Sequence, residues 1–252
     1  MQIIKSIKAQ LIIYLICFAI FLVIKDKGIF EFLLTVGLAV VSALGVESAV
    51  LYFRTKIWRI TDSSIITGLI IGYVLSTDQA WWMFLAASAL AILSKYLIVF
   101  KKKHIFNPAA FGIFLTIILF GASTQWKGTY AWYILLPCGV YFAQKIGKLK
   151  IVISYLLTCL VLFGTQAIVQ RIPLGHILGY LSYFYIFVMI IEPKTSPVKP
   201  RGQIIFGAGI AILIFMLTEF GAKFDVELFS LLILNMAVLL INKITFKQGA
   251  AR

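Results

Sequence analysis

The chain has 252 residues, of which 62% are hydrophobic and only 13% are charged, and its mean hydropathy is +1.03. A soluble domain carries about 25% charged residues, so this composition excludes a water-soluble globular protein. The formal net charge of +14 could indicate nucleic-acid binding, but the basic residues lie in short connections between apolar runs. That placement argues against nucleic acid and favours anionic lipid headgroups as counterions.

Ten apolar segments follow one another, each close to the length at which a helix crosses a bilayer. We expect helices because an open strand edge does not occur in hydrocarbon. The first segment lacks a small-residue cleavage site and is predicted to be a retained span. The third and fifth contain glycine or proline and are predicted to be short or broken. The segments are residues 9–24, 30–53, 63–77, 81–100, 105–124, 129–145, 151–169, 174–191, 203–221 and 228–242.

Six clusters of lysine and arginine alternate with pairs of these segments and hold most of the 23 basic residues. Such asymmetry in short loops places the cluster side in the cytoplasm, with both termini inside and the chain multi-pass in the inner (plasma) membrane. Acidic residues gather in the opposite, outer loops. The clusters are Lys5/Lys8, Arg54/Lys56/Arg59, Lys101/Lys102/Lys103, Lys145/Lys148/Lys150, Lys194/Lys199/Arg201 and Lys243/Lys247/Arg252.

The fold class is therefore all-α: a polytopic membrane protein of about ten transmembrane helices, with residues 1–252 as a single integral membrane domain. Ten spans divide into five plus five, and a repeat of five spans must be inverted across the membrane. We expect approximate repeats at 1–125 and 126–252. Inverted repeats place functional sites at the repeat interface, on broken helices.

The first unusual segment on the inner face is Arg59–Leu69. Asp62 or Ser63 is expected to cap the helix that follows. The helix start is then either an ordinary capped terminus or a site for an anion or a cofactor phosphate.

The second inner-face segment, Lys101–Gly112, contains Asn107-Pro108 within an apolar run. Proline removes a backbone donor, so the Asn107 side chain either satisfies the broken backbone or faces a ligand. The third segment, Glu192–Gly202, has three prolines and is expected to be a stiff non-helical loop. Glu192 at its start either is functional or pairs with Arg201 or a lysine.

Glu47 and Lys95 are charges in the middle of apolar segments. Either they neutralise each other, or Glu47 belongs to an ion path, for which Asp62 and Glu192 are further candidates. The three cysteines lie in apolar segments without metal or redox spacing, so they are interpreted as buried hydrophobes and no metal site is predicted.

Six pieces of the chain, in this order, resemble the RnfD/NqrB family, whose members are membrane subunits of the Rnf electron-transport complex and of the sodium-pumping NADH:quinone reductase. The resemblance covers roughly residues 35 to 242. The Asn-Pro-Ala piece alone is weak, but its combination with the proline loop and Arg-Gly is specific. The pieces are Ser63–Leu69, Trp81-Trp82, Ile105–Ala109, Glu192–Pro197, Pro200–Ala208 and Phe229–Asn235.

The resemblance implies two inverted five-helix repeats, flavin held within the membrane and electron transfer coupled to cation movement. In the family, FMN is esterified to a threonine in a long outer insertion after the fifth helix. Here only Gly121–Trp126 stands there, and residues 174–179 lack the Ser-Gly-Ala of many members, so covalent FMN at Thr124 is not expected. A noncovalent flavin, FMN or riboflavin, is expected instead. Its binding residues would be Ser63, Thr67, Gly68, Asn107, Pro108, Thr195, Ser196, Arg201 and Gly202.

The leading functional hypothesis is a redox subunit that passes electrons through flavin and couples this to Na⁺ or H⁺ translocation. Without a Rossmann fingerprint or a cysteine cluster, the chain would need partners: other membrane subunits and a cytoplasmic flavin or iron–sulfur electron donor. The alternative is a small-solute or ion transporter, or a channel, on the same inverted-repeat scaffold without redox activity.

Overall fold

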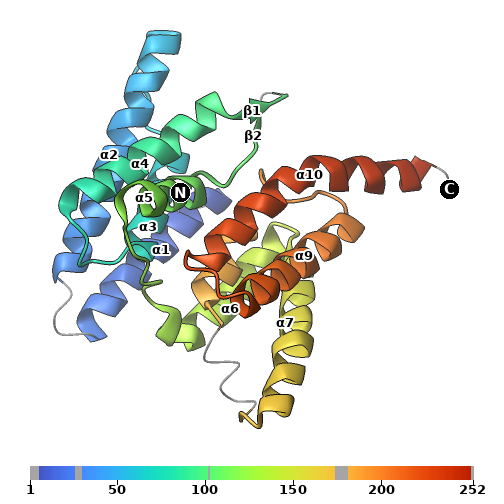
Figure 1. The fold of residues 1–252 in the computed structure, drawn as a ribbon. Coiled ribbons are helices and arrows are strands. Elements are labelled where there is room, and N and C mark those ends of the chain that lie inside the picture. Colours follow the sequence, from blue (N-terminus) through green and yellow to red (C-terminus); the bar gives the residue numbers. More distant parts are fainter. Residues whose placement is uncertain (1–5, 26–29, 102, 174–180, 251–252) are drawn as a thin grey trace. The chain divides into compact units, whose positions relative to one another are not determined.

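The computed structural model describes residues 6–25, 30–101, 103–173 and 181–250. Helices dominate these residues (Figure 1). A short antiparallel hairpin, β1 (Val99–Phe100) with β2 (Lys103–His104), and a π-helical turn, η3 (Tyr185–Met189), are the main departures from α-helix. The α-helices are α1 Ile7–Lys25, α2 Phe30–Thr55, α3 Asp62–Val74, α4 Trp81–Leu97, α5 Pro108–Phe120, α6 Trp132–Lys145, α7 Leu149–Gln170, α9 Pro200–Glu219 and α10 Val226–Ala250.

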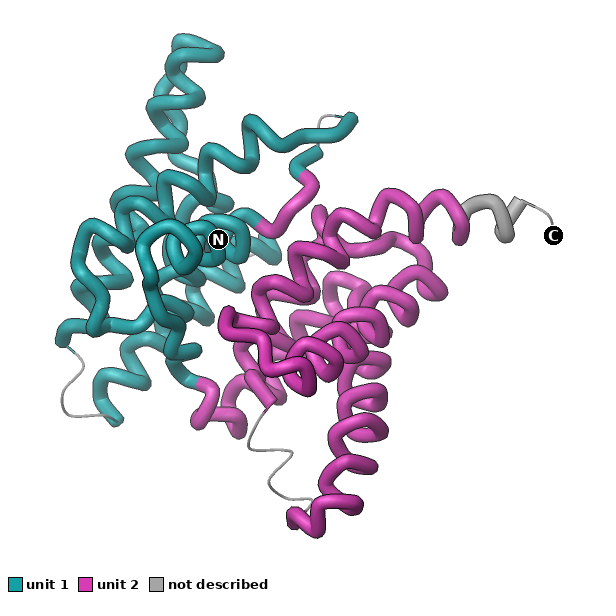
Figure 2. Tube along the Cα trace, viewed as in Figure 1, with its two compact units in different colours: residues 1–104, 108–128 teal, residues 105–107, 129–252 magenta. Residues whose placement is uncertain are grey.

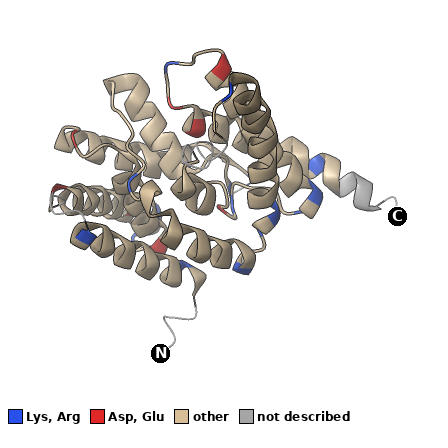
Figure 3. Ribbon diagram, turned by 90° about the horizontal axis from the view of Figure 1, so that it is seen from below, with Lys and Arg blue, Asp and Glu red and all other residues tan. Residues whose placement is uncertain are grey.

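Helices α1, α2, α7, α9 and α10 are each long and apolar enough to span a membrane, and α3, α4 and α5 are shorter apolar helices. The helix bodies are almost free of charge, and most lysines and arginines lie at helix ends or in connections (Figure 3). The all-α, polytopic membrane fold class is therefore confirmed.

The short third and fifth segments are confirmed. Helices α3 and α5 have 13 residues each, about 20 Å of helix against a hydrocarbon core about 30 Å thick. The open carbonyl end of α3 is closed by the chain after α5, where the N–H groups of Gln125 and Lys127 donate to the carbonyls of Val74 (2.8 Å) and Tyr73 (2.7 Å). These bonds satisfy the backbone where the helix stops short.

Several predicted segment ends differ from the helix ends of the structure, and two of them show why. Residues 99 and 100 were expected to be helical but form β1, because the helix ends at Leu97 and the lysine-rich turn folds back as a hairpin. Glu192–Gly202 was expected to be non-helical throughout, but α9 begins at Pro200, where proline is pre-organised as a first helical residue. Of the predicted segment 174–191, residues 174–180 lie outside the described residues.

The chain divides into two compact units (Figure 2). Unit 1 comprises residues 1–104 and 108–128, and unit 2 comprises residues 105–107 and 129–252. In unit 1, α2 packs against α3 and α4, and α4 packs against α5. In unit 2, α9 packs against both α7 and α10.

Glycine allows the closest of these helix contacts, since hydrocarbon provides no hydrophobic drive for helix association and packing must do so. A Cβ atom on Gly68 of α3 would lie 2.5 Å from the Cα of Val40 on α2. One on Gly207 of α9 would lie 2.4 Å from the carbonyl oxygen of Ile151 on α7. Both units thus hold a helix pair together at a glycine.

Candidate functional site

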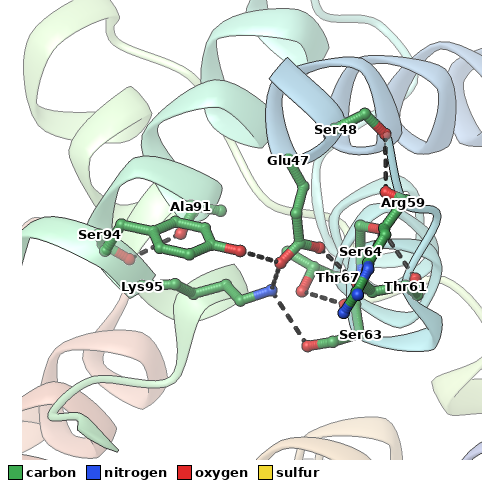
Figure 4. A network of polar contacts seen from close by, with 11 residues as sticks. Glu47, Ser48, Arg59, Thr61, Ser63, Ser64, Thr67, Ala91, Ser94 and Lys95 are labelled. Atoms are coloured by element: carbon green, nitrogen blue, oxygen red, sulfur yellow. Dashed lines mark hydrogen bonds and ion pairs between the residues drawn. The ribbon is translucent and has the colours of Figure 1, made fainter. Parts of the chain in front are cut away.

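A buried carboxylate is the centre of a polar network in unit 1 (Figure 4). Glu47 of α2 is 3% exposed. Its Oε1 accepts from the Lys95 ammonium at 2.7 Å and from the Tyr96 hydroxyl at 2.8 Å, and its Oε2 accepts from the Thr61 hydroxyl at 2.6 Å. The predicted neutralisation of Glu47 by Lys95 is therefore confirmed as a buried ion pair.

Three parts of unit 1 position this network. Glu47 lies on α2, Lys95 and Tyr96 lie on the last turn of α4, and Thr61 and Ser63 lie at the start of α3. The Lys95 ammonium also donates to the Ser63 hydroxyl at 3.1 Å. Removing one partner of such a buried pair leaves an uncompensated charge and costs about 3–5 kcal/mol. Lys95 and Glu47 therefore tie α2 to α4.

The cap of α3 differs from the prediction. Asp62 or Ser63 was expected as the capping residue, but Thr61 is the N-cap, and its Oγ1 accepts from the Ser64 N–H at 3.2 Å. Asp62 is instead the first helical residue and is exposed. Because the Thr61 hydroxyl donates to Glu47, one side chain both caps the helix and completes the carboxylate's shell.

The other predicted binding residues of α3 are engaged within the protein. The Thr67 hydroxyl donates to the Ser63 carbonyl at 2.8 Å, one turn earlier. The face on which Gly68 would bear a Cβ atom is occupied by the backbone of α2. Gly68 thus serves helix packing, and contact with a cofactor at either residue stays a prediction.

A second buried cluster, in unit 2, is built from neutral amides. The Asn107 N–H donates to Asn235 Oδ1 at 2.9 Å, and Asn235 Nδ2 donates to the Thr195 carbonyl at 3.0 Å. Asn107 Nδ2 donates to the carbonyl of Met189, at the end of the π-helical turn, at 3.3 Å. Of the two predicted roles for Asn107, satisfaction of broken backbone is the one that these contacts show.

The loop before α9 is held by its own side chains. The Thr195 hydroxyl donates to Glu192 Oε2 at 3.1 Å, and the Ser196 hydroxyl donates to the Glu192 carbonyl at 2.6 Å. Thr195 and Ser196 are each 3% exposed, whereas Glu192 is half-buried. The loop therefore has a set conformation, which its prolines alone would not provide.

Lys148 fixes the same loop from the start of α7. Its ammonium donates to the Pro197 carbonyl at 2.6 Å and to the Ser196 carbonyl at 3.4 Å. The residue is 5% exposed. Burial lowers the pKa of the Lys148 ammonium from its ordinary 10.5 to about 8, because a charge loses hydration there.

The remaining predicted residues lie at helix starts. Pro108 is the first residue of α5, where its missing N–H leaves no helical bond unmade. Arg201 is exposed in the first turn of α9. Gly202 follows it, and a Cβ atom there would lie 3.0 Å from Pro197 and 3.1 Å from Ile241.

The predicted residues thus form two groups, one in each unit. Unit 1 holds Glu47, Asp62, Ser63, Thr67, Gly68 and Pro108, and unit 2 holds Asn107, Glu192, Thr195, Ser196, Arg201 and Gly202.

Four residues that organise these groups were not predicted: Thr61, Tyr96, Lys148 and Asn235. Asn235 had a visible signal, since it is an amide in the middle of an apolar span. Lys148 belongs to a basic cluster that was interpreted as a topology signal, and nothing in its sequence context distinguishes it from Lys145 or Lys150.

The two groups differ in chemistry. In unit 1, a carboxylate oxygen of Glu47 and the hydroxyl oxygen of Ser63 both accept from the Lys95 ammonium, so the group is built on a charged pair. In unit 2, the hydroxyls of Thr195 and Ser196 donate to protein acceptors and keep only acceptor capacity for a ligand.

Comparison with known proteins agrees with this two-unit organisation. The model of the NQR2, RnfD, RnfE family matches the chain twice, over residues 2–131 and 121–250. The two matches overlap over residues 121–131, and this stretch contains residues 128 and 129, where unit 1 gives way to unit 2.

Several curated relatives are named as subunits of an ion-translocating oxidoreductase complex. Those from Yersinia enterocolitica and Aeromonas hydrophila are each 24% identical to this chain over 298 aligned residues, covering 84% of the chain and 85% of the relative. One from Escherichia coli is 32% identical over 135 residues, covering 51% of this chain and 37% of its own length. In the first two, 84% of a 252-residue chain matches a longer stretch of the relative, so these relatives contain residues that this chain lacks. The chain belongs to the NQR2, RnfD, RnfE family.

Proposed function

We propose that the chain is a membrane subunit of an ion-translocating oxidoreductase complex, in the inner membrane with both termini in the cytoplasm. The double match to the family model is the observation that supports this most strongly. The relatives named as subunits of such a complex support it over most of the chain's length. Being one subunit, the chain would act with other membrane subunits and a cytoplasmic flavin or iron–sulfur donor.

The proposal includes a noncovalent flavin, which supplies one- and two-electron transfer when bound. The described residues fit this group in a restricted way. In unit 2, Thr195 and Ser196 already donate their hydroxyl hydrogens within the protein, so they would accept from the ring's N–H rather than donate to its oxygens; in unit 1, Thr67 is restricted in the same way. For FMN, the start of α9 with Arg201 would suit the phosphate, because helix N–H groups and a guanidinium both favour an anion.

The coupling of electron transfer to cations is proposed to involve Glu47. Glu47 is a carboxylate that is 3% exposed, and its two oxygens accept from three donors, so a cation reaching it would compete with the Lys95 ammonium. Asp62 and Glu192 stay candidates for the approach of the ion from the cytoplasmic side.

Flavin analysis of the full chain, purified from membranes in mild detergent, tests the proposal. We expect a yellow protein that releases its flavin into the supernatant on acid precipitation. A colourless chain that copurifies with no redox-active subunit would contradict the redox role and favour a transporter or channel on the same scaffold. Flavin retained in the acid precipitate would show a covalent site.

A further inference from the structure

The last turn of α2 and the connection to α3 form a basic surface in unit 1, on the predicted cytoplasmic side. We call residues 52–60 the α2 end. Each residue from 53 to 60 is exposed, and the stretch carries the basic cluster Arg54/Lys56/Arg59. The acidic residue that follows it is Asp62, the first residue of α3. Positive charge therefore predominates where this surface meets the inner leaflet.

The length of α2 places this end among lipid headgroups. With 26 residues, the helix is about 39 Å long. The hydrocarbon core of a bilayer is about 30 Å thick, and the headgroup regions bring the whole to about 40–45 Å. When the apolar body of α2 spans the hydrocarbon, its last turn, which carries Arg54, therefore lies at the level of the lipid phosphates.

Large apolar side chains stand between the basic ones. Ile57, Trp58 and Ile60 are 49%, 65% and 76% exposed. The Trp58 ring stacks on Tyr52 with the ring centroids 4.8 Å apart, and the Lys56 ammonium lies 5.7 Å from the centroid of the Tyr52 ring. None of the other five basic clusters in the sequence contains a tryptophan. Because tryptophan favours the membrane–water interface, this pattern indicates a loop that lies against the bilayer.

Contacts within unit 1 hold this surface in place. The Arg54 guanidinium lies 4.9 Å from the centroid of the Tyr96 ring, and its Nη2 donates to the Tyr96 carbonyl at 3.4 Å. The Arg59 carbonyl accepts from the Ser48 hydroxyl at 3.1 Å, which holds the loop against α2. A guanidinium has five N–H donors, so the contact with Tyr96 leaves Arg54 able to bind a phosphate as well.

We propose that the α2 end binds the headgroup of an anionic phospholipid in the inner leaflet. Arg54, Lys56 and Arg59 would donate to the headgroup, while Trp58 and Ile60 would contact the adjoining ester and acyl region. These apolar contacts favour a lipid over a free anion, which would leave the exposed indole and isoleucine in water. The site needs neither flavin nor ion coupling, so its failure and theirs are distinguishable.

Trp58 serves as the reporter of its own surroundings. The full chain with Trp58 as its single tryptophan is reconstituted into bilayers. Quenching is then compared for phosphatidylglycerol and phosphatidylcholine that carry the same chains, brominated near the ester end. We expect phosphatidylglycerol to bind at least about fivefold more strongly, since one basic residue near the surface contributes about that factor. The tryptophans replaced by phenylalanine are Trp81, Trp82, Trp126 and Trp132.

Two controls show whether the preference is local. A variant that keeps Trp132 instead of Trp58, on the predicted outer side, should show no preference for phosphatidylglycerol. In the Trp58 reporter, replacing three exposed lysines of unit 2 by glutamine should leave the ratio of the two lipids unchanged. These lysines are Lys145, Lys150 and Lys194.

Arg54→Gln, Lys56→Gln and Arg59→Gln together should bring the ratio close to one. If this triple variant does not fold, Lys56→Gln with Arg59→Gln, which keeps the contact of Arg54 with Tyr96, should still lower the ratio. Equal quenching by the two lipids, or the same loss in the lysine control, would overturn the proposal. Absence of quenching by either lipid would also overturn it and would favour docking of a protein. Inorganic phosphate at constant ionic strength should leave the preference in place, and its loss would show a site for a free anion instead.

Discussion

The two units bury polar groups in opposite ways. Unit 1 places a charged carboxylate in the interior and neutralises it with a lysine, two hydroxyls completing the shell. Unit 2 uses neutral asparagines, and its buried lysine meets backbone carbonyls. Both arrangements satisfy broken backbone, but only the first holds a full ion pair among the described residues.

This difference separates a cluster that supports packing from one that could respond to ions. An amide cluster is satisfied by fixed hydrogen bonds and changes little when ions change. A carboxylate–ammonium pair is held by charge, so its strength depends on the charge state of both partners. The contacts of unit 2 position the loop before α9, whereas the role of Glu47 in ion coupling is part of our proposal.

The largest expected effect comes from breaking the ion pair. Lys95→Met should destabilise the chain by about 3–5 kcal/mol, since Glu47 would stay buried without its counter-charge. The measurement is reversible unfolding in mixed detergent micelles, with the exposed Lys103→Met as control. The double variant with Glu47→Gln and Lys95→Met should lose less stability than the Lys95→Met variant alone. A loss below about 1 kcal/mol would show that the pair is solvated.

The second effect tests whether glycine packing is common to both units. Gly68→Ala and Gly207→Ala should each cost about 1–3 kcal/mol, because the new Cβ atom would overlap backbone of the facing helix. The controls are Gly45→Ala and Gly164→Ala, which have open space and should gain up to about 1 kcal/mol of helix propensity. Equal changes in stability at the two tight and the two open positions would contradict the close helix contacts.

The third effect probes the amide cluster. Asn235→Ala removes the partner of the Asn107 N–H and of the Thr195 carbonyl, and unsatisfied buried groups cost about 1–3 kcal/mol. Hydrogen exchange should then speed up at Asn107. Asn242→Ala, which loses a single longer bond to the Val198 N–H, should change stability less. If Asn242→Ala lost more stability than Asn235→Ala, Asn242 would be the main support of the loop.

The smallest effect is the pH dependence due to Lys148. Its pKa of about 8 in the folded chain lies below the ordinary 10.5, so the unfolded chain binds more protons between these values. Stability from this residue should therefore rise as pH increases from about 8 to 10.5. The free energy of unfolding, measured across this pH range, should rise less in the Lys148→Met variant than in the unchanged chain. An identical rise would assign the titration to another group.

Much of the fold could be predicted because insertion of a segment into a membrane depends on the hydropathy of that segment. The apolar runs predicted the positions of α1, α2, α7, α9 and α10 in the chain. The glycines and Pro108 indicated which helices are short. The hairpin after Leu97 and the helical start at Pro200 could not be predicted, because both depend on which backbone groups find partners after folding.

The candidate site divides in the same way. The residues alone indicated the membrane class and showed Glu47 and Lys95 as charges in apolar segments. Their motifs also resembled the family to which the chain belongs. The folded chain was needed to show that Thr61, and not Asp62, caps α3, that Asn235 binds Asn107, and that Lys148 fixes the proline loop. The physical reason is range: hydropathy and propensity act within a segment, whereas these hydrogen bonds join residues that are far apart in the chain or compete for one donor.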